Sequence, residues 1–308
     1  MTAIVAIDAV AKRYGKVEAL RDVGFELEAG KVMALVGHNG AGKTTLMKLM
    51  LGLIVPSAGS VRILGQDPAG RRGAAVRRAI GFLPESVAFP GAMSGREIMA
   101  FYCRLKGEAP AAGNALLERV GLGEAIDRRV STYSKGMRQR LGLAQAMIGR
   151  PRLLLLDEPT TGLDPALRQE FYAMLDTLRA DGVAILLSSH ALAEIETKAD
   201  AFALIGRGRL LACDDLPALQ HSVALALRIT VRVTPCTTGR VLEAVSGRAE
   251  IEARAPDRLL LLCDAAAKVD LLGRIAQLGD IVRDIETERP NLDAIYRALL
   301  ARQQEALS

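Results

Sequence analysis

The sequence has no tryptophan, few other aromatic residues and no apolar run long enough to cross a membrane. Aromatic residues make up 4% of its 308 residues, so it offers no stacking platform for single-stranded nucleic acid. A membrane-spanning helix needs about 20 consecutive apolar residues, and charged residues interrupt every run before that length. The start also lacks the basic segment and apolar core of a secretion signal. The sequence therefore predicts a cytoplasmic protein with no nucleic-acid partner.

The four cysteines are widely spaced, and no C-x-x-C pair occurs among them. This spacing is typical of reduced, buried thiols rather than of disulfides. Met93, Met99 and Cys103 lie close together in sequence, and we interpret them as apolar packing rather than as a copper site. The net charge is +5, and the residues from His221 onward carry 12 basic and 12 acidic side chains. The positive excess therefore belongs to the preceding region.

Among the residues that are present, the run at 37–45 carries the most information. It reads Gly-His-Asn-Gly-Ala-Gly-Lys-Thr-Thr and matches the phosphate-loop pattern G-x-x-x-x-G-K-[ST]. An apolar run precedes it and a helical pattern follows it, so its backbone N–H groups can face a phosphate at a helix N-terminus. We expect Lys43 to reach the β- and γ-phosphates of a nucleotide and the Thr44 hydroxyl to bind Mg²⁺. The residues expected to hold the nucleotide here are Gly37, Asn39, Gly40, Ala41, Gly42, Lys43, Thr44 and Thr45.

A second segment, at 153–159, consists of four leucines followed by Asp157, Glu158 and a proline. Four consecutive leucines are typical of a strand buried on both faces of a parallel sheet, and the carboxyl ends of such strands hold functional groups. We expect Asp157 to bind Mg²⁺, directly or through water, and Glu158 to act as the general base on the attacking water. An ordinary turn after a strand would explain the leucines but not the paired acids.

Between these segments, residues 132–140 read Thr-Tyr-Ser-Lys-Gly-Met-Arg-Gln-Arg. With this third motif the chain resembles the ATPase subunit of an ABC transporter, whose signature usually reads Leu-Ser-Gly-Gly-Gln. Ser134 and Gly136 match that signature, and a serine hydroxyl and a glycine N–H at a helix start suit an anion. Lys135 and Met137 depart from it, which adds a positive charge and removes a hydrogen-bonding side chain.

Further elements of the family pattern appear in family order within the first 215 residues. The resemblance implies that Tyr14 stacks on adenine and that Asp164 lies in the loop that crosses to the partner subunit. It also implies that Glu85, in place of the usual glutamine, contacts the triphosphate and Mg²⁺. His190 would hold the γ-phosphate and the water in line. On their own, a strand tyrosine and a histidine at a strand end would be taken as structural. The expected catalytic residues are Lys43, Glu158 and His190.

The predicted fold class is α/β, with a P-loop ABC-type ATPase domain that includes a helical subdomain, followed by a small α+β domain. We assign residues 1–219 to the ATPase domain, because strand and helix patterns alternate there, and about 86–150 to its helical arm. Residues 220–308 show the order β-α-β-β-α-β, which suggests a ferredoxin-like fold with its first strand at 224–233. A last helix follows, with Asn291 as its N-cap. Dimerisation or regulation is the expected role of this accessory domain.

The resemblance also implies partners. In the family, two ATPase domains pack head to tail, so that the phosphate loop of one faces the signature of the other around ATP and Mg²⁺. A homodimer of this chain is therefore expected, bound to two copies of a separate transmembrane permease. This places it peripherally on the cytoplasmic face of the inner membrane. The stretch from Glu85 to Cys103 is the expected coupling surface. A periplasmic accessory protein, reached through the permease, is a further expected partner.

Two segments, at 37–45 and 133–146, are also similar to the NosF family, the ATPases of NosDFY complexes, which support copper-site maturation of periplasmic nitrous oxide reductase. His38 stands at an otherwise variable position of the phosphate loop and serves as a label of that family. The alternative is the ATPase of a drug, haem or lipid exporter, because such subunits share Leu-Pro-Glu at 83–85 and Tyr-Ser-Lys-Gly-Met at 133–137.

Two other classes fit less well. A non-transport ABC ATPase acting on DNA or ribosomes usually carries a long coiled coil or two ATPase domains in one chain, and neither is found here. A catalytically inactive regulatory subunit would not be expected to retain Lys43, Asp157, Glu158 and His190. The sequence leaves the transported species and the direction of transport open.

Overall fold

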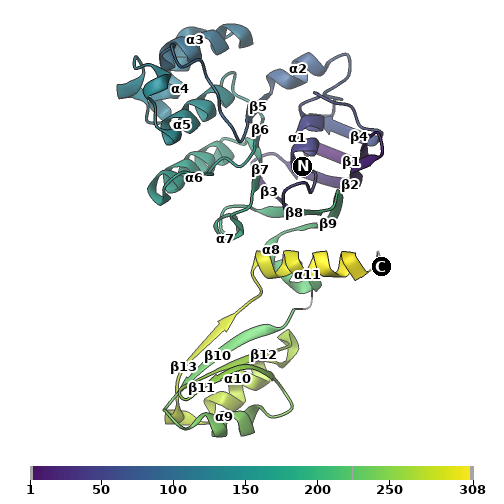
Figure 1. Cartoon of the computed structure of the whole chain (residues 1–308), viewed down its shortest axis with the longest axis vertical. Coiled ribbons are helices and arrows are strands. Elements are labelled where there is room, and N and C mark those ends of the chain that lie inside the picture. The colour runs from purple at the N-terminus through teal and green to yellow at the C-terminus, as the bar shows by residue number, and fades with distance from the viewer. Residues whose placement is uncertain (1–2, 224, 306–308) are drawn as a thin grey trace. The chain divides into compact units, whose positions relative to one another are not determined.

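The computed structural model describes residues 3–223 and 225–305, and the chain divides into two compact units, 1–215 and 216–308 (Figure 1). The boundary that we place after residue 219 from the sequence falls inside helix α8 (Leu216–Val223). The second unit therefore begins with a complete helix rather than with a linker. Among the described helices, none is both long and apolar enough to span a membrane.

The first unit is built around a six-stranded sheet with the strand order β5-β6-β7-β3-β8-β9. The first five strands of this order run parallel, and the edge strand β9 is antiparallel to β8. Every residue of β3, β6 and β7 is buried, as the run of leucines in β6 predicts for strands that are covered on both faces. The strands are β3 (Val32–Val36), β5 (Ile80–Leu83), β6 (Leu153–Leu156), β7 (Ala184–Ser189), β8 (Ala201–Gly206) and β9 (Arg209–Asp214).

A three-stranded antiparallel sheet, in the order β2-β1-β4, packs beside the parallel sheet (Figure 1). Its strands share one hydrophobic core with helix α1 and with β3, β6 and β7. This core holds α1 against both sheets, which fixes the start of α1 at the carboxyl end of β3. The elements are β1 (Ala3–Tyr14), β2 (Val17–Glu28), β4 (Ala58–Ile63) and α1 (Lys43–Met50), with α2 (Gly73–Arg78), α6 (Pro165–Ala180) and α7 (Leu192–Ile195) completing the unit.

Helices α3 (Gly95–Lys106), α4 (Pro110–Arg119) and α5 (Lys135–Ala146) form a helical arm (Figure 1). Ser94 and Glu97 form a reciprocal capping box at the start of α3. Met99 and Cys103 are buried where α3 meets α4, and a Cβ atom on Gly113 would lie 3.0 Å from the Met99 Cβ. These two side chains thus pack an interhelical contact.

The second unit has a four-stranded antiparallel sheet in the order β11-β12-β10-β13, and its elements follow the predicted order β-α-β-β-α-β. Ala224, where we expect the first strand to begin, lies outside the described residues. The expected cap of the last helix is present, since Asn291 Oδ1 accepts a hydrogen bond from the Ala294 N–H at 2.9 Å. The elements are α8 (Leu216–Val223), β10 (Leu227–Val233), α9 (Thr238–Val245), β11 (Glu250–Ala255), β12 (Arg258–Cys263), α10 (Lys268–Ala276), β13 (Val282–Glu288) and α11 (Leu292–Glu305).

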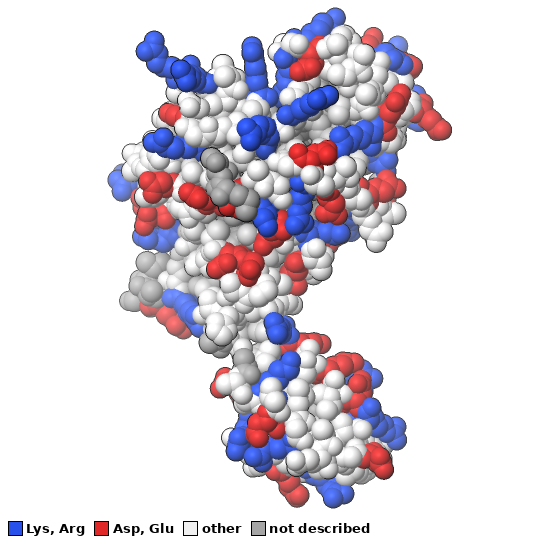
Figure 2. All heavy atoms as spheres, turned by 180° about the vertical axis from the view of Figure 1, so that it is seen from behind, with Lys and Arg blue, Asp and Glu red and all other residues white. Residues whose placement is uncertain are grey.

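The core of the second unit lies between its sheet and helices α9 and α10. On the face shown in Figure 2, basic and acidic side chains are interspersed over this unit, in line with its equal numbers of both. No single sign of charge dominates that face.

Candidate functional site

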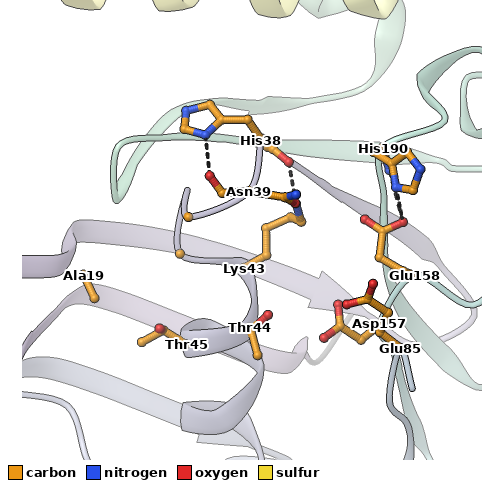
Figure 3. A pocket seen from close by; sticks show the side chains of 13 residues that line it. Ala19, His38, Asn39, Lys43, Thr44, Thr45, Glu85, Asp157, Glu158 and His190 are labelled. Atoms are coloured by element: carbon orange, nitrogen blue, oxygen red, sulfur yellow. Dashed lines mark hydrogen bonds and ion pairs between the residues drawn. The ribbon is translucent and has the colours of Figure 1, made fainter. Parts of the chain in front are cut away.

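Four parallel strands end side by side at one edge of the large sheet, and the residues after them line a cavity of about 460 Å³ (Figure 3). The strands are β5, β6, β7 and β3, whose carboxyl ends meet because parallel strands run in one direction. Thirteen residues line the cavity: Ala19, Gly37, His38, Asn39, Gly40, Gly42, Lys43, Thr44, Thr45, Glu85, Asp157, Glu158 and His190.

The loop between β3 and α1 follows a path that only small residues allow. Gly42 has φ 113°, and a Cβ atom there would lie 2.6 Å from Leu20 Cδ2. A Cβ atom on Gly37 would lie 2.7 Å from the carbonyl oxygen of Ile205. Both glycines are therefore required by the close packing of this loop against β2 and β8.

Lys43, the first residue of α1, is buried inside this loop, and its Nζ donates a hydrogen bond to the Gly37 carbonyl oxygen. The loop thus encloses the ammonium group at the positive end of α1, where an anion is favoured. Ala41 is buried; its N–H donates to the His38 carbonyl oxygen and its own carbonyl oxygen accepts from the Gly208 N–H, both at 3.0 Å.

Asp157 and Glu158 follow β6, and both are buried. Ser188, near the end of the neighbouring strand β7, connects them, because its hydroxyl donates to Asp157 Oδ1 at 2.6 Å and accepts from the Glu158 N–H at 2.9 Å. Glu158 also has φ 47°, a left-handed conformation that costs a non-glycine residue about 1 kcal/mol or more. No role for Ser188 was predicted from the sequence. The feature that could have indicated one is a hydroxyl residue at the end of a buried strand.

His190 lies beside Glu158 (Figure 3). Its Nδ1 is 2.7 Å from Glu158 Oε2, and its backbone N–H donates to the same oxygen at 3.3 Å. Because a carboxylate only accepts hydrogen bonds, His190 Nδ1 carries the proton in this contact. The imidazole is 68% exposed and the carboxylate 10%, so the histidine covers the acid from the solvent side. The geometry places a potential base next to a ring that holds it in one orientation.

Five residues that we expect to bind nucleotide do not line this cavity, and one of them is Ala41 within the phosphate loop itself. Tyr14 is 47% exposed at the end of β1, and Lys12 Nζ lies 5.2 Å from the centre of its ring. Ser134 caps α5 by accepting a hydrogen bond from the Met137 N–H at 3.2 Å. Gly136 is the second residue of α5, and Asp164 caps α6. Within one chain, the signature and the Asp164 loop are thus separate from the phosphate loop.

A buried glutamine connects the signature helix to the acidic segment. Gln139, on α5, donates from Nε2 to the Pro159 carbonyl oxygen at 2.8 Å. This bond fixes the chain directly after Glu158. No role for Gln139 was predicted from the sequence, although it is a polar residue on an otherwise apolar face of its helix.

Comparison with known proteins identifies the family. Residues 20–161 match the family model described as ABC transporter. The doxorubicin resistance ATP-binding protein DrrA of Mycobacterium tuberculosis is 34% identical over 329 aligned positions, covering 99% of this chain and 96% of that protein. The chain belongs to the ATP-binding subunits of ABC transporters. Proteins of this family are ATPases, so this ABC subunit binds and hydrolyses ATP, and such subunits work with separate permeases, typically as dimers.

Two other similarities concern mainly the first unit of the ABC subunit. The lantibiotic transport ATP-binding protein SrtF of Streptococcus pyogenes is 38% identical over 205 residues, covering 67% of this chain and 88% of that protein. A solved structure, an ATP-binding subunit of an ABC transporter, superposes with a TM-score of 0.66 and 29% identity, covering 71% of this chain and 92% of that one. The P-loop ABC fold with mixed α/β content is thereby established.

Proposed function

We propose that this ABC subunit powers an exporter of amphipathic, drug-like compounds, acting as a homodimer on two copies of a separate permease at the cytoplasmic face of the inner membrane. One observation carries this choice. The doxorubicin resistance protein covers 99% of this chain, including the second unit, whereas the lantibiotic transport protein covers 67%. The accessory unit is thus a feature shared along its whole length with a relative whose name refers to drug resistance.

The cavity residues fit ATP and Mg²⁺ chemically. The enclosed Lys43 and the start of α1 suit the β- and γ-phosphates. The Thr44 hydroxyl and the carboxylates of Asp157 and Glu85 line the same cavity, and such oxygen donors are the ligands that Mg²⁺ prefers. Bound Mg²⁺ would neutralise charge on the phosphates.

Glu158 and His190 are the proposed catalytic pair. The buried carboxylate of Glu158 is held by Nδ1 and by the backbone N–H of His190, so it can accept a proton from a water aligned with the γ-phosphate. The other ring nitrogen of His190, Nε2, takes no part in this contact, and because the imidazole is 68% exposed we infer that Nε2 can meet the γ-phosphate. Positioning and charge stabilisation of this kind carry most of the catalysis in phosphoryl transfer.

The second copy of the chain would complete the site. Ser134, Gly136 and Asp164 lie outside the cavity of their own chain, while the hydroxyl of Ser134 and the start of α5 offer donors to an anion. In a head-to-tail homodimer they would contact the nucleotide held by the partner, and Tyr14 would stack on adenine at the edge of the cavity. The ATP site is therefore proposed to form only on closure of the dimer.

Lys135 offsets the charge of Glu85. These two side chains line one cavity of about 360 Å³ together with Arg138. Lys135 also lies over the loop after Glu158, because a Cβ atom on Gly162 would be 2.9 Å from Lys135 Cε. We infer that the two departures from the usual family pattern compensate each other electrostatically across this cavity.

The outer face of α3 is the proposed coupling surface for the permease. Phe101 and Leu105 are 46% and 65% exposed there, and Tyr102 packs edge to face against both Phe89 and Phe101. Aromatic residues are scarce in this chain, and exposed apolar side chains that gather on one helix mark an interaction surface. Replacing Phe101 by Glu is expected to abolish co-purification with the permease while leaving ATP binding intact.

The accessory unit is proposed to be ferredoxin-like. Its sheet places the first and third strands, β10 and β12, in the centre and is antiparallel throughout, with both helices contributing to one core. Support of the dimer or regulation remains the role we propose for it.

The narrower prediction of a role in nitrous oxide reductase maturation, with a periplasmic accessory partner, rests on resemblance alone, chiefly of the residues at 37–45 and 133–146. The names of the relatives above refer to drug resistance and lantibiotic transport instead. We therefore keep export of drug-like compounds as the proposal and treat copper-site maturation as the alternative outcome of its test.

One protein variant, expressed in the native host, distinguishes export of drug-like compounds from copper-site maturation. With Glu158 replaced by Gln, export predicts increased intracellular accumulation of doxorubicin and a lowered inhibitory concentration, with normal copper content in nitrous oxide reductase. Unchanged drug accumulation together with a copper-deficient reductase would contradict the export proposal. Arg240→Ala, at an exposed position of the second unit, is the control.

A further inference from the structure

The second unit contains a small cavity that has no part in the ATPase mechanism. Its volume is about 210 Å³, and it lies between α8, the start of α10 and the segment after β13. Three basic side chains reach it from these three places: His221, Lys268 and Arg289. The rest of the wall is Gln220 with two prolines and two leucines.

Within the described part of the chain, these basic side chains are not paired with a carboxylate. No carboxylate lines the cavity, and across residues 3–223 and 225–305 none of His221, Lys268 and Arg289 forms an ion pair. Other arginines of the same unit are paired with carboxylates at hydrogen-bonding distance. These pairs are Arg228 with Glu252, Arg232 with Glu286, Arg248 and Arg274 with Asp270, and Arg297 with Asp293. The basic side chains around this cavity are thus among those in the described part of the unit that form no such pair.

The walls of the cavity are held in place by the fold. Gln220 Nε2 donates to the Pro290 carbonyl oxygen at 2.9 Å, which joins α8 to the residue after Arg289. Lys268 is the first residue of the nine-residue helix α10, at the end where the helix dipole is already positive. A lysine at this end adds to the positive potential instead of balancing it. The cavity is therefore preorganised for negative charge.

We propose that this cavity binds a small anion that carries one phosphate group. A guanidinium, an ammonium and a ring N–H supply donors that match the several oxygens of a phosphate, and both ionic partners give charge-assisted bonds. The volume is smaller than the roughly 300 Å³ at which drug-sized sites begin, so a phosphate monoester with a short apolar group fits and a nucleoside triphosphate does not. The two leucines would contact the apolar group.

Such a ligand would connect three elements that are far apart in sequence. Helix α8 follows directly on the last residue of the first unit, at position 215. An anion shared by α8, α10 and the segment before α11 would order the beginning and the end of the accessory unit together. The site therefore gives this unit a sensing role that is independent of the substrate of the transporter.

The test uses the full-length protein saturated with Mg-ADP, so that the phosphate loop is occupied. Inorganic phosphate is titrated calorimetrically at constant ionic strength, with chloride as the balancing ion. We expect saturable binding to the wild type and at least tenfold weaker binding to Lys268→Ala/Arg289→Ala. The matched control is Arg240→Ala/Arg283→Ala, which removes two exposed arginines of the same unit outside the cavity and should bind as the wild type does.

Equal phosphate binding by all three proteins, or no binding to the wild type, would overturn the proposal. Lys268→Gln/Arg289→Gln keeps the side-chain length and replaces the alanine variant if that one does not fold. Glycerol phosphate and vesicles containing phosphatidylglycerol are then compared. If glycerol phosphate binds and this binding requires Lys268 and Arg289, the ligand is a free phosphate ester. If only the vesicles bind, the ligand is a lipid headgroup. The export proposal is not affected by either result.

Discussion

Ser188 is the residue on which the geometry of the acidic pair depends. Within the described residues, its hydroxyl alone joins the Asp157 carboxylate to the Glu158 backbone by hydrogen bonds. Replacing Ser188 by Ala leaves a buried carboxylate oxygen and a buried N–H without that partner, and each such loss costs about 1–3 kcal/mol. We expect an unfolding free energy lower by about 2 kcal/mol and ATP turnover reduced at least tenfold.

Urea unfolding and a phosphate-release assay measure these two effects. Ser222→Ala is the control, because Ser222 is not buried and its hydroxyl only donates to the nearby Leu219 carbonyl oxygen. Turnover by the Ser188 variant at the wild-type rate would show that Asp157 and Glu158 are positioned without it.

The cysteines differ sharply in their surroundings. Cys236 is exposed, whereas Cys103 and Cys263 are buried and burial raises the pKa of both thiols. For Cys213, burial raises the pKa to about 11. A raised pKa leaves less reactive thiolate at pH 7.5, so a maleimide should label Cys236 rapidly and the other three only on unfolding. Mass spectrometry of the native protein tests this, and a Cys236→Ser variant that is still labelled rapidly would contradict it.

At the scale of elements, two helical glycines differ in the space that a Cβ atom would have. A Cβ atom on Gly136 in α5 would lie 2.7 Å from Leu167 Cδ1, whereas nothing lies within 4 Å of a Cβ atom on Gly273 in α10. Alanine is favoured over glycine in a helix by about 0.5–1 kcal/mol. Gly273→Ala should therefore raise the stability of the second unit by that amount, while Gly136→Ala should lower turnover by moving α5 away from α6.

Scanning calorimetry measures the stability of the second unit if that unit unfolds in a separate transition. If it does not, hydrogen exchange of the α10 amides measures the same stability. A destabilising Gly273→Ala would mean that the helix has a packing partner there. Unchanged turnover of Gly136→Ala would mean that the contact between α5 and Leu167 does not position the signature.

The sequence predicted most of these elements because their signals are local. The buried leucines of β6 and the cap at Asn291 each depend on neighbouring residues, and the structure has both. What it did not predict are contacts between segments distant in sequence. Ser188 lies 31 residues from Asp157, and Gln139 lies 20 residues from Pro159. No periodicity or motif encodes such a pairing.

The predicted boundary after residue 219 lies four residues beyond the division between the two compact units, for a related reason. Helix α8 reads as a continuation of the first unit, with no glycine- or proline-rich linker to separate it. Its assignment to the second unit depends on contacts with α11, which begins at Leu292. The predicted site residues that line one cavity, from the phosphate loop to His190, all belong to local sequence motifs.

At the scale of the whole molecule, the account requires two copies of the chain for one reaction. The cavity holds the phosphate loop, the acidic pair and His190, but Ser134 and Gly136 lie outside it. ATP should therefore bring two chains together, and hydrolysis should release them. A chain that hydrolyses ATP fully as a monomer would need a different explanation for the signature at α5.

The most direct measurement is light scattering coupled to size-exclusion chromatography of Glu158→Gln with and without Mg-ATP. We expect a monomer without nucleotide, a stable dimer with ATP and no release of phosphate, because the base is lost while every ATP contact remains. The double variant Glu158→Gln/Ser134→Ala should dimerise more weakly, since it also loses a donor to the partner's nucleotide. A Glu158→Gln protein that releases phosphate at the wild-type rate, or stays monomeric with saturating ATP, would contradict the account.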